Sequence, residues 1–140
     1  MILIDTNVVS EVMKVAPADA VVGWLNDQDS SSLFISTTSI GEIEYGLRIL
    51  PDGKRRTHLR ERFEHFIDQA FAMRIVPFDE TAAVEYGDIM GLRKELGRPL
   101  SVPDGQIAAI TRSRGYALAT RNIRDFEDCG LALINPFENP

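Results

Sequence analysis

The chain is 140 residues long, with 44% hydrophobic and 26% charged residues, which is typical of a globular protein that folds as one domain over residues 1–140. Its formal net charge of −6 argues against a protein that coats nucleic acid by bulk electrostatic attraction. The single Cys129 cannot form an internal disulfide, and the apolar start, Met1 to Ile4, is too short for a signal peptide or a membrane span, so we expect a cytoplasmic protein without membrane attachment.

Short apolar runs alternate with stretches of helical periodicity along the chain. In the first half the predicted elements are a strand at 2–4, helices at 6–14 and 19–26, a strand at 33–36, and a helix from Thr38 to the Pro-Asp-Gly break at 51–53. In the second half they are a helix at 54–72, a strand at 75–76, helices at 80–96 and 102–113, and strands at 116–120 and 131–134. Trp24 lies on the apolar face of its helix, so we expect it to pack in the core.

This alternation predicts an α/β fold with a central parallel sheet and helices on both faces. In such folds the functional crevice lies beyond the carboxyl ends of the strands. Asp5 follows the first strand at such an end. The simplest explanation of Asp5, Thr6 and Asn7 is that they cap the first helix. Asp5 is also a candidate for the functional site.

Acidic residues near the other strand ends strengthen that candidacy. They are Glu42 or Glu44 after the second strand, Asp104 in the helix before the fourth strand, and Asp125, close to Asn122, after the fourth strand. Each has a simpler explanation when taken alone, because Asp104 completes a capping box with Ser101 and the glutamates can face solvent. Their shared position at one edge of a parallel sheet points instead to a joint role.

Clustered carboxylates repel one another unless a cation lies among them. The candidate ligands are all oxygen atoms, because the two histidines, His58 and His65, lie on the long helix at 54–72, away from this edge. Hard oxygen ligands favour Mg²⁺ or Mn²⁺ over Zn²⁺. Enzymes that hydrolyse phosphodiester bonds commonly use a magnesium ion held by carboxylates and water.

A basic stretch lies outside this pattern. Residues 53–62 hold five cationic side chains against the single Glu61. They read most simply as a solvated helix face, but cations near a helix N-terminus oppose the helix dipole. The stretch therefore has either a binding partner or a small energetic cost.

Four motifs occur in order and together resemble a protein family. They are LIDTN at 3–7, E-I-E-Y-G at 42–46, D-x-x-I-A-A at 104–109 and A-T-R-N-x-x-D-F at 119–126. The chain resembles PIN-domain ribonucleases of the VapC toxin branch, and VPFDE at 76–80 with INPF at 134–137 resembles the FitB-like subgroup. The resemblance runs from Met1 to Phe137 and implies a three-layer PIN-like fold.

The resemblance also implies a function. It implies a Mg²⁺-dependent endoribonuclease, with Mn²⁺ as a possible substitute, that acts as the toxin of a bacterial type II toxin–antitoxin pair and cleaves RNA with a metal-activated water. The expected partners are an RNA substrate, a small antitoxin that covers the active-site groove, and a second copy of the chain. The antitoxin would bring the complex to DNA, since nothing in this acidic chain resembles a DNA-reading helix.

Site residues follow from matching the family motifs. Asp5, Glu42 and Asp104 match the acidic triad, which leaves Glu44 outside the site. Either Asp125 or Asn122 completes the metal ligands, and sequence does not choose between them. The neighbouring residues Thr6, Asn7 and Thr120 are expected to orient Asp5 and bound waters, and Arg121 to face phosphate or the antitoxin.

Two other functions compete with this reading. In a haloacid-dehalogenase-like phosphatase Asp5 would be the nucleophile, but that chemistry normally needs a second acid two residues later, where this chain has Asn7, and no lysine partner is evident. A catalytically idle PIN-like binding module is the other alternative. The complete acidic triad argues against it.

Overall fold

The computed structural model describes residues 1–70 and 74–138, and its centre is a parallel sheet with the strand order β3-β2-β1-β4-β5. The strands are β1 (Ile2–Ile4), β2 (Leu33–Ser36), β3 (Ile75–Val76), β4 (Ala117–Ala119) and β5 (Leu133–Ile134). Every strand pair in this sheet is parallel. The predicted fold class is confirmed, and the first strand of the chain lies in the middle of the sheet.

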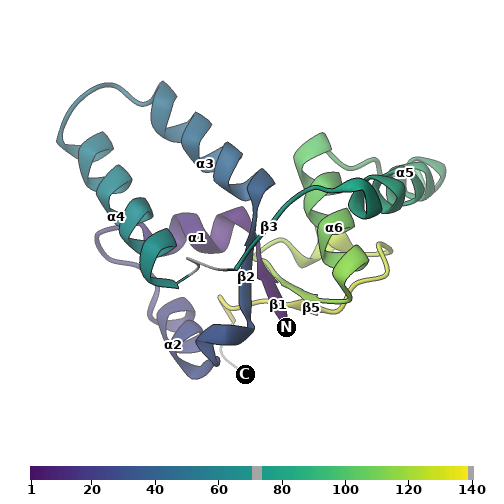
Figure 1. The fold of residues 1–140 in the computed structure, drawn as a ribbon, viewed down its shortest axis with the longest axis horizontal. Coiled ribbons are helices and arrows are strands. Elements are labelled where there is room, and N and C mark those ends of the chain that lie inside the picture. Colours follow the sequence, from purple (N-terminus) through teal and green to yellow (C-terminus); the bar gives the residue numbers. More distant parts are fainter. Residues whose placement is uncertain (71–73, 139–140) are drawn as a thin grey trace.

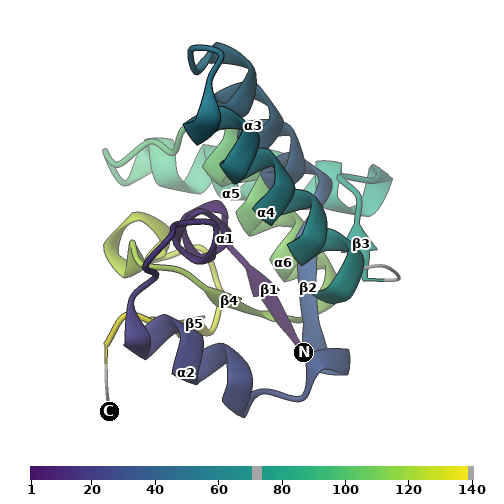
Figure 2. The ribbon, with the colours of Figure 1, turned by 90° about the vertical axis from the view of Figure 1, so that its left-hand side faces the viewer.

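Helices cover both faces of the sheet, as Figures 1 and 2 show. They are α1 (Thr6–Val12), α2 (Asp19–Asp27), α3 (Thr37–Ile49), α4 (Lys54–Ala70), α5 (Glu80–Glu95) and α6 (Val102–Arg114), with short 3-10 turns η1 (Ser30–Ser32) and η2 (Ile123–Phe126). Leu3 of β1 packs in the core formed with α5 and α6, whereas the next residue, Ile4, packs in the core formed with α1 to α4. This alternation along one buried strand produces the three layers.

Some boundaries differ from the sequence-based prediction. The first helix ends at Val12 rather than residue 14, with Met13 as its C-cap. The segment after β4 forms a 3-10 turn, and the last strand is only two residues long. The predicted end of the long helix, residues 71–72, lies outside the described residues. Trp24 packs against the α1-to-α4 core, as predicted.

The register of the central strands assembles the candidate site. Ile4 pairs with Ile35 on one side and with Ala119 on the other. The residues that follow these strands, Asp5 and Thr120 among them, therefore emerge together at one edge of the sheet. The Asp5 N–H donates to the Ala119 carbonyl at 2.9 Å, which extends the pairing up to this edge.

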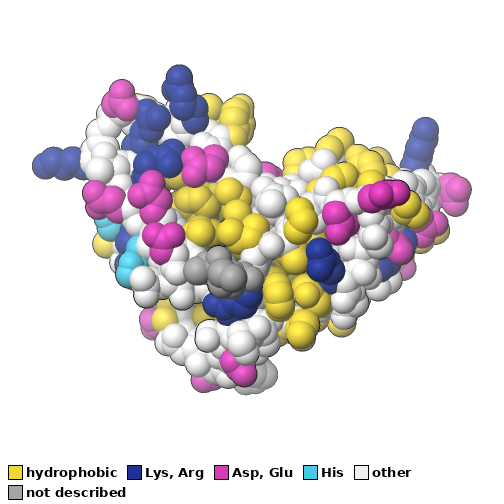
Figure 3. All heavy atoms as spheres, in the orientation of Figure 1, with side chains coloured by type: hydrophobic (Ala, Val, Ile, Leu, Met, Phe, Trp, Pro, Cys, Tyr) yellow, Lys and Arg dark blue, Asp and Glu magenta, His cyan; other side chains and the backbone are white. Residues whose placement is uncertain are grey.

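The α3–α4 pair and the α5–α6 pair form two arms above the sheet (Figure 1). Hydrophobic side chains gather in the saddle between these arms, and Lys and Arg side chains gather at the tip of the α3–α4 arm (Figure 3). None of the helices in the described part of the chain is long and apolar enough to cross a lipid bilayer.

Candidate functional site

Asp5 is held by hydrogen bonds on both carboxylate oxygens. It is the N-cap of α1, and its Oδ1 accepts from the Thr6 N–H at 2.8 Å. Its Oδ2 accepts from the Thr120 hydroxyl at 2.8 Å and from Asn7 Nδ2 at 3.2 Å. The helix-capping explanation is confirmed, and the same carboxylate also faces the edge of the sheet where the candidate site is expected.

Burial of Asp5 disfavours the ionised form of its carboxyl group. Asp5 is 4% exposed, and removal from water raises its pKa to about 6, against hydrogen bonds from Thr120 and Thr6 that lower it. The negative charges of Asp104 and Glu42 raise the pKa further. A cation bound nearby would stabilise the ionised form of this carboxyl group.

Glu42 reaches the same edge from α3. Ser36 starts this helix by accepting a hydrogen bond from the Ser39 N–H on its hydroxyl, at 3.0 Å. The Thr6 hydroxyl lies 2.8 Å from Glu42 Oε1 and 2.8 Å from Ser39 Oγ. A carboxylate can only accept, so the Thr6 hydrogen is directed at Glu42. Glu44 instead forms an ion pair with Arg60 of α4 at 3.2 Å, away from the edge.

Asp104 comes from the first turn of α6. Its backbone N–H donates to the Ser101 hydroxyl at 3.3 Å, so the capping predicted for Ser101 is present. Burial raises the Asp104 pKa, as does the charge of Asp125, while the Arg93 guanidinium lowers it. The neighbouring Gly105 packs closely against α5, where an added Cβ would lie 2.5 Å from Met90 Sδ.

These three acids line one open cavity of about 430 Å³. The other residues that line it are Thr6, Asn7, Ser10, Glu11, Lys14, Arg121 and Asn122. Asp125 lines a neighbouring hollow instead, and Arg121 and Asn122 border both. Of the two residues considered for the fourth position, Asn122 therefore borders the cavity directly, whereas Asp125 acts on it through its effect on Asp104.

The segment after β4 is tied to α1 by a small polar network. The Arg121 N–H donates to Asn7 Oδ1 at 3.2 Å, and the Asn122 N–H donates to the Thr120 hydroxyl at 3.1 Å. The Arg121 guanidinium carbon lies 4.6 Å from the centre of the Phe137 ring, in a cation–π contact. These contacts hold Arg121, which lines the acidic cavity.

Sequence reasoning did not identify several residues of the cavity. Glu11 and Lys14 form an ion pair at 2.9 Å, and Glu11 also accepts from the Ala18 N–H at 2.9 Å. The Lys14 hydrogen bond lowers the Glu11 pKa, followed in effect by the bond from Ala18. Their spacing is that of an ordinary helix ion pair. No local pattern distinguishes them from such surface residues.

The donor set fits a hard divalent ion. The three acids offer only oxygen ligands, and neither His58 nor His65 borders the cavity. Among the described residues no group of three acidic, histidine or cysteine side chains converges closely enough to hold an ion by itself. Mg²⁺ commonly keeps several waters and takes one or two protein carboxylates, so the partly open arrangement suits it.

The basic stretch is largely engaged within the chain. Arg56 pairs with Asp52 at 2.5 Å, Arg60 pairs with Glu44, and Arg62 donates to the Val12 carbonyl at 3.2 Å. Arg55 lines an apolar groove that continues from the acidic cavity between α1, α3 and α4. Most of these cations are therefore satisfied locally.

Comparison with known proteins gives a consistent assignment. The model of the PIN domain family matches residues 2–130. VapC ribonuclease Y4jK of Sinorhizobium fredii is 41% identical over 138 residues, which cover 99% of both chains. Toxin FitB of Neisseria gonorrhoeae is 36% identical, with 99% of this chain and 100% of that protein covered.

Solved structures agree. A crystal structure of FitAcB from Neisseria gonorrhoeae superposes with a TM-score of 0.90 at 36% identity, covering 99% of this chain and 100% of the other. DNA-bound VapBC from Salmonella typhimurium superposes with a TM-score of 0.82 at 25% identity, covering 96% and 97%. The resemblance seen in the sequence motifs is thereby confirmed for the whole fold.

Proposed function

The chain belongs to the PIN-domain family, among relatives that are VapC ribonucleases and toxins, and we propose that it is a Mg²⁺-dependent endoribonuclease and the toxin of a bacterial toxin–antitoxin pair. The observation that carries this proposal is the meeting of Asp5, Glu42 and Asp104 in one cavity. These residues come from three elements far apart in the sequence. Their joint placement is hard to attribute to helix capping alone.

We assign ligand roles to the acids of the cavity. Asp5 and Asp104 would hold the ion, with help from Glu42 and from Asn122 or Asp125. A divalent ion bound there supplies positive charge to the phosphate oxygens and makes water a stronger nucleophile. Thr6, Asn7 and Thr120 orient the ligands, because they donate to the carboxylate oxygens of Glu42 and Asp5.

The two cations of the cavity suit a phosphate backbone. Lys14 and Arg121 lie on the walls of the acidic cavity of a chain with a net charge of −6. RNA is repelled by the protein as a whole and needs local cations to approach the carboxylates. We propose that Arg121, held by Phe137, contacts a phosphate next to the one that is cleaved.

Partners are proposed from the relatives. The structures similar to this chain include FitAcB and a VapBC complex on DNA. We propose that this chain likewise binds a small antitoxin, that it forms a homodimer, and that the antitoxin brings the assembly to DNA. We propose RNA cleavage in the cytoplasm as the function of the free toxin.

Cleavage of RNA by the purified full chain tests this function. We expect cleavage in Mg²⁺, partial activity in Mn²⁺, and none in EDTA. Asp5→Asn should abolish cleavage because it removes a ligand charge while keeping the cap. Glu42→Gln and Glu44→Gln form a matched pair on one helix, and only the first should lose activity, since Glu44 faces Arg60.

Two results would contradict the proposal. Cleavage that persists in EDTA and in Asp5→Asn would show that the acidic cavity is not the nuclease site. Toxicity in a host that is equal for the wild type and Asp5→Asn would favour the idle binding module.

A further inference from the structure

Arg93 is a buried arginine of α5 that does not border the acidic cavity. Only 4% of the residue is exposed. Its guanidinium forms no ion pair with any carboxylate among residues 1–70 and 74–138. A buried cation is costly unless its N–H groups are satisfied, so its acceptors indicate why the position holds an arginine.

These acceptors are backbone carbonyls of two loops. Nε donates to the Arg98 carbonyl at 2.8 Å, in the loop that follows α5. Nη1 donates to the carbonyls of Asp125 at 2.7 Å and Glu127 at 3.0 Å, and lies 3.5 Å from Cys129 Sγ. One planar guanidinium thereby joins the loop before α6 to the segment after β4.

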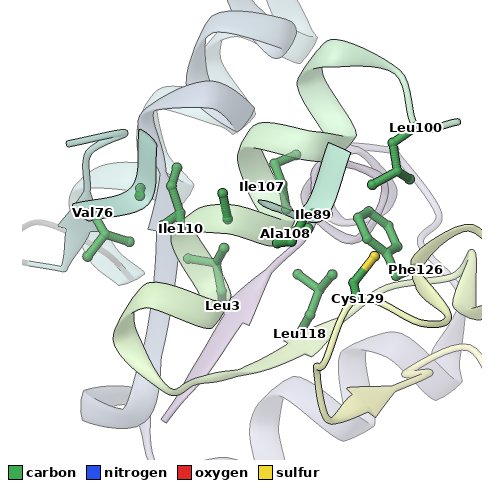
Figure 4. Packing of buried hydrophobic residues seen from close by; sticks show 12 residues of the cluster. Leu3, Val76, Ile89, Leu100, Ile107, Ala108, Ile110, Leu118, Phe126 and Cys129 are labelled. Atoms are coloured by element: carbon green, nitrogen blue, oxygen red, sulfur yellow. The ribbon is translucent and has the colours of Figure 1, made fainter. Parts of the chain in front are cut away.

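Each of these loops leads to a residue of the acidic site. The first loop ends at Ser101, the N-cap of α6, whose first turn holds Asp104. The second segment, η2, holds Asp125 and follows Asn122. Leu100 and Phe126, one from each loop, are both buried in the same core, and Figure 4 shows them on the same side of it as Cys129.

We propose that Arg93 is a positioning residue of the metal site, which fixes the separation between Asp104 and the Asn122–Asp125 segment and so sets the affinity for a divalent ion. This inference rests on the proposed function. The planar fork of arginine directs several N–H groups at fixed angles, whereas lysine offers one compact ammonium group. Lysine at this position would keep the charge and lose the connection between the two loops.

Binding of Mn²⁺ to the full chain, followed by electron paramagnetic resonance, tests this inference. We expect Arg93→Lys to weaken Mn²⁺ binding about 10- to 100-fold, as is usual when residues that support metal ligands are changed. Arg98→Gln is the matched control. Arg98 contacts Glu127 and Asp128 of the same segment through exposed ion pairs, so its loss should leave the affinity unchanged.

Hydrogen exchange in the metal-free protein provides an independent measurement. In Arg93→Lys the amides of residues 123–129 should exchange faster, while those of Leu3 and Leu118 in the sheet keep their wild-type rates. Wild-type Mn²⁺ affinity in Arg93→Lys would overturn the inference. Unchanged exchange at 123–129, or faster exchange throughout the sheet, would also overturn it.

The two proposals fail in different ways. A wild-type chain that binds no Mn²⁺ and cleaves no RNA refutes the proposed function, whatever Arg93 does. A wild-type chain that is active, beside an Arg93→Lys variant with unchanged binding and exchange, refutes only the positioning role.

Discussion

The Thr120 hydroxyl donates a 2.8 Å hydrogen bond to Asp5 Oδ2 across a sequence separation of 115 residues. The same hydroxyl accepts from the Asn122 N–H, and Thr120 is fully buried. One side chain therefore joins the N-terminal carboxylate to the segment after β4. It also favours the ionised form of Asp5 against the effect of burial.

Thr120→Val should destabilise the protein and raise the Asp5 pKa above its value of about 6. The valine has a similar shape but removes the shorter of the two hydrogen bonds to Asp5 Oδ2, which keeps only the one from Asn7, and it leaves the Asn122 N–H without its acceptor. Loss of a hydrogen bond to a charged group costs about 1–3 kcal/mol of unfolding free energy. Urea denaturation at pH 7 measures the loss. Thr120→Ser keeps the hydroxyl and serves as the control, and equal stability of the two variants would contradict the assignment.

The contribution of Asp5 to the stability of the metal-free protein should fall as pH rises from about 4 to about 6. Asp5 has a pKa of about 6 in the folded chain and an ordinary pKa of 3.8 in the unfolded chain, so the folded state binds the extra proton in this range. Raising the pH removes that proton and its stabilising effect. The loss is at most about 3 kcal/mol, from 1.36 kcal/mol for each pKa unit.

Asp5→Asn removes this titration and provides the check. In EDTA at pH 7.5 the variant should unfold at higher urea concentration than the wild type, and its advantage should shrink at pH 4.5. If the unfolding free energies of the two proteins change with pH in the same way, the titration of Asp5 does not cause the pH dependence of stability.

Mg²⁺ should raise the melting temperature of the wild type at neutral pH more than choline chloride of equal ionic strength. An ion at ten times its dissociation constant adds about 1.4 kcal/mol to the unfolding free energy. Asp104→Asn should reduce this response and stabilise the metal-free protein, because burial and the Asp125 charge raise the Asp104 pKa. Equal responses to both salts would rule out a metal site.

Arg121→Gln should weaken RNA binding to a similar extent for all sequences, because a phosphate contact carries no base specificity. The slope of log affinity against log salt should fall by about 0.7 for a single-stranded RNA. Arg114→Gln is the control. Arg114 lies at the C-terminal end of α6, whereas Asp104 of the cavity lies in its first turn, and Arg114 pairs with Asp79. If the slope of log affinity against log salt is unchanged in Arg121→Gln, Arg121 does not contact a phosphate of the RNA.

Gly105→Ala and Gly87→Ala should have opposite effects on stability. An added Cβ at Gly105 would lie 2.5 Å from Met90 Sδ and 3.0 Å from Tyr86 Cε2, whereas nothing lies within 4 Å at Gly87. We expect a loss of about 1–3 kcal/mol from overpacking at Gly105. At Gly87 the better helix former should add about 0.5–1 kcal/mol. Thermal unfolding of both variants measures the difference, and stabilisation by both would contradict the close packing beside Asp104.

Local signals explain which parts of the fold were predictable. The apolar runs and the caps at Asp5 and Ser101 act within a few residues, so the sequence pattern predicts the strands and helix starts. The ends of α1 and the 3-10 form of η2 depend on how the chain leaves each element, which patterns specify weakly. The family motifs singled out the three acids that line the cavity, but spacing alone does not distinguish Glu42 from Glu44.

Tertiary packing explains what sequence reasoning missed. Arg93 stands in the last turn of α5, where a cation reads as a charge that complements the helix dipole. Its burial against the Asp125 and Glu127 carbonyls exists only once α5 has packed beside η2. The choice between Asn122 and Asp125 likewise depends on the direction of side chains within one short turn.

The central place of β1 in the sheet has a consequence for synthesis of the chain on the ribosome. Asp5 leaves the ribosome well before its neighbour in the sheet, β4, and its hydrogen-bond partner Thr120, which follows it by 115 residues. A partly translated chain therefore lacks the finished setting of its first carboxylate. Pairing across such a sequence separation is also slow. The proposed nuclease would thus stay inactive until the strand that carries Thr120 has been made and paired with β1.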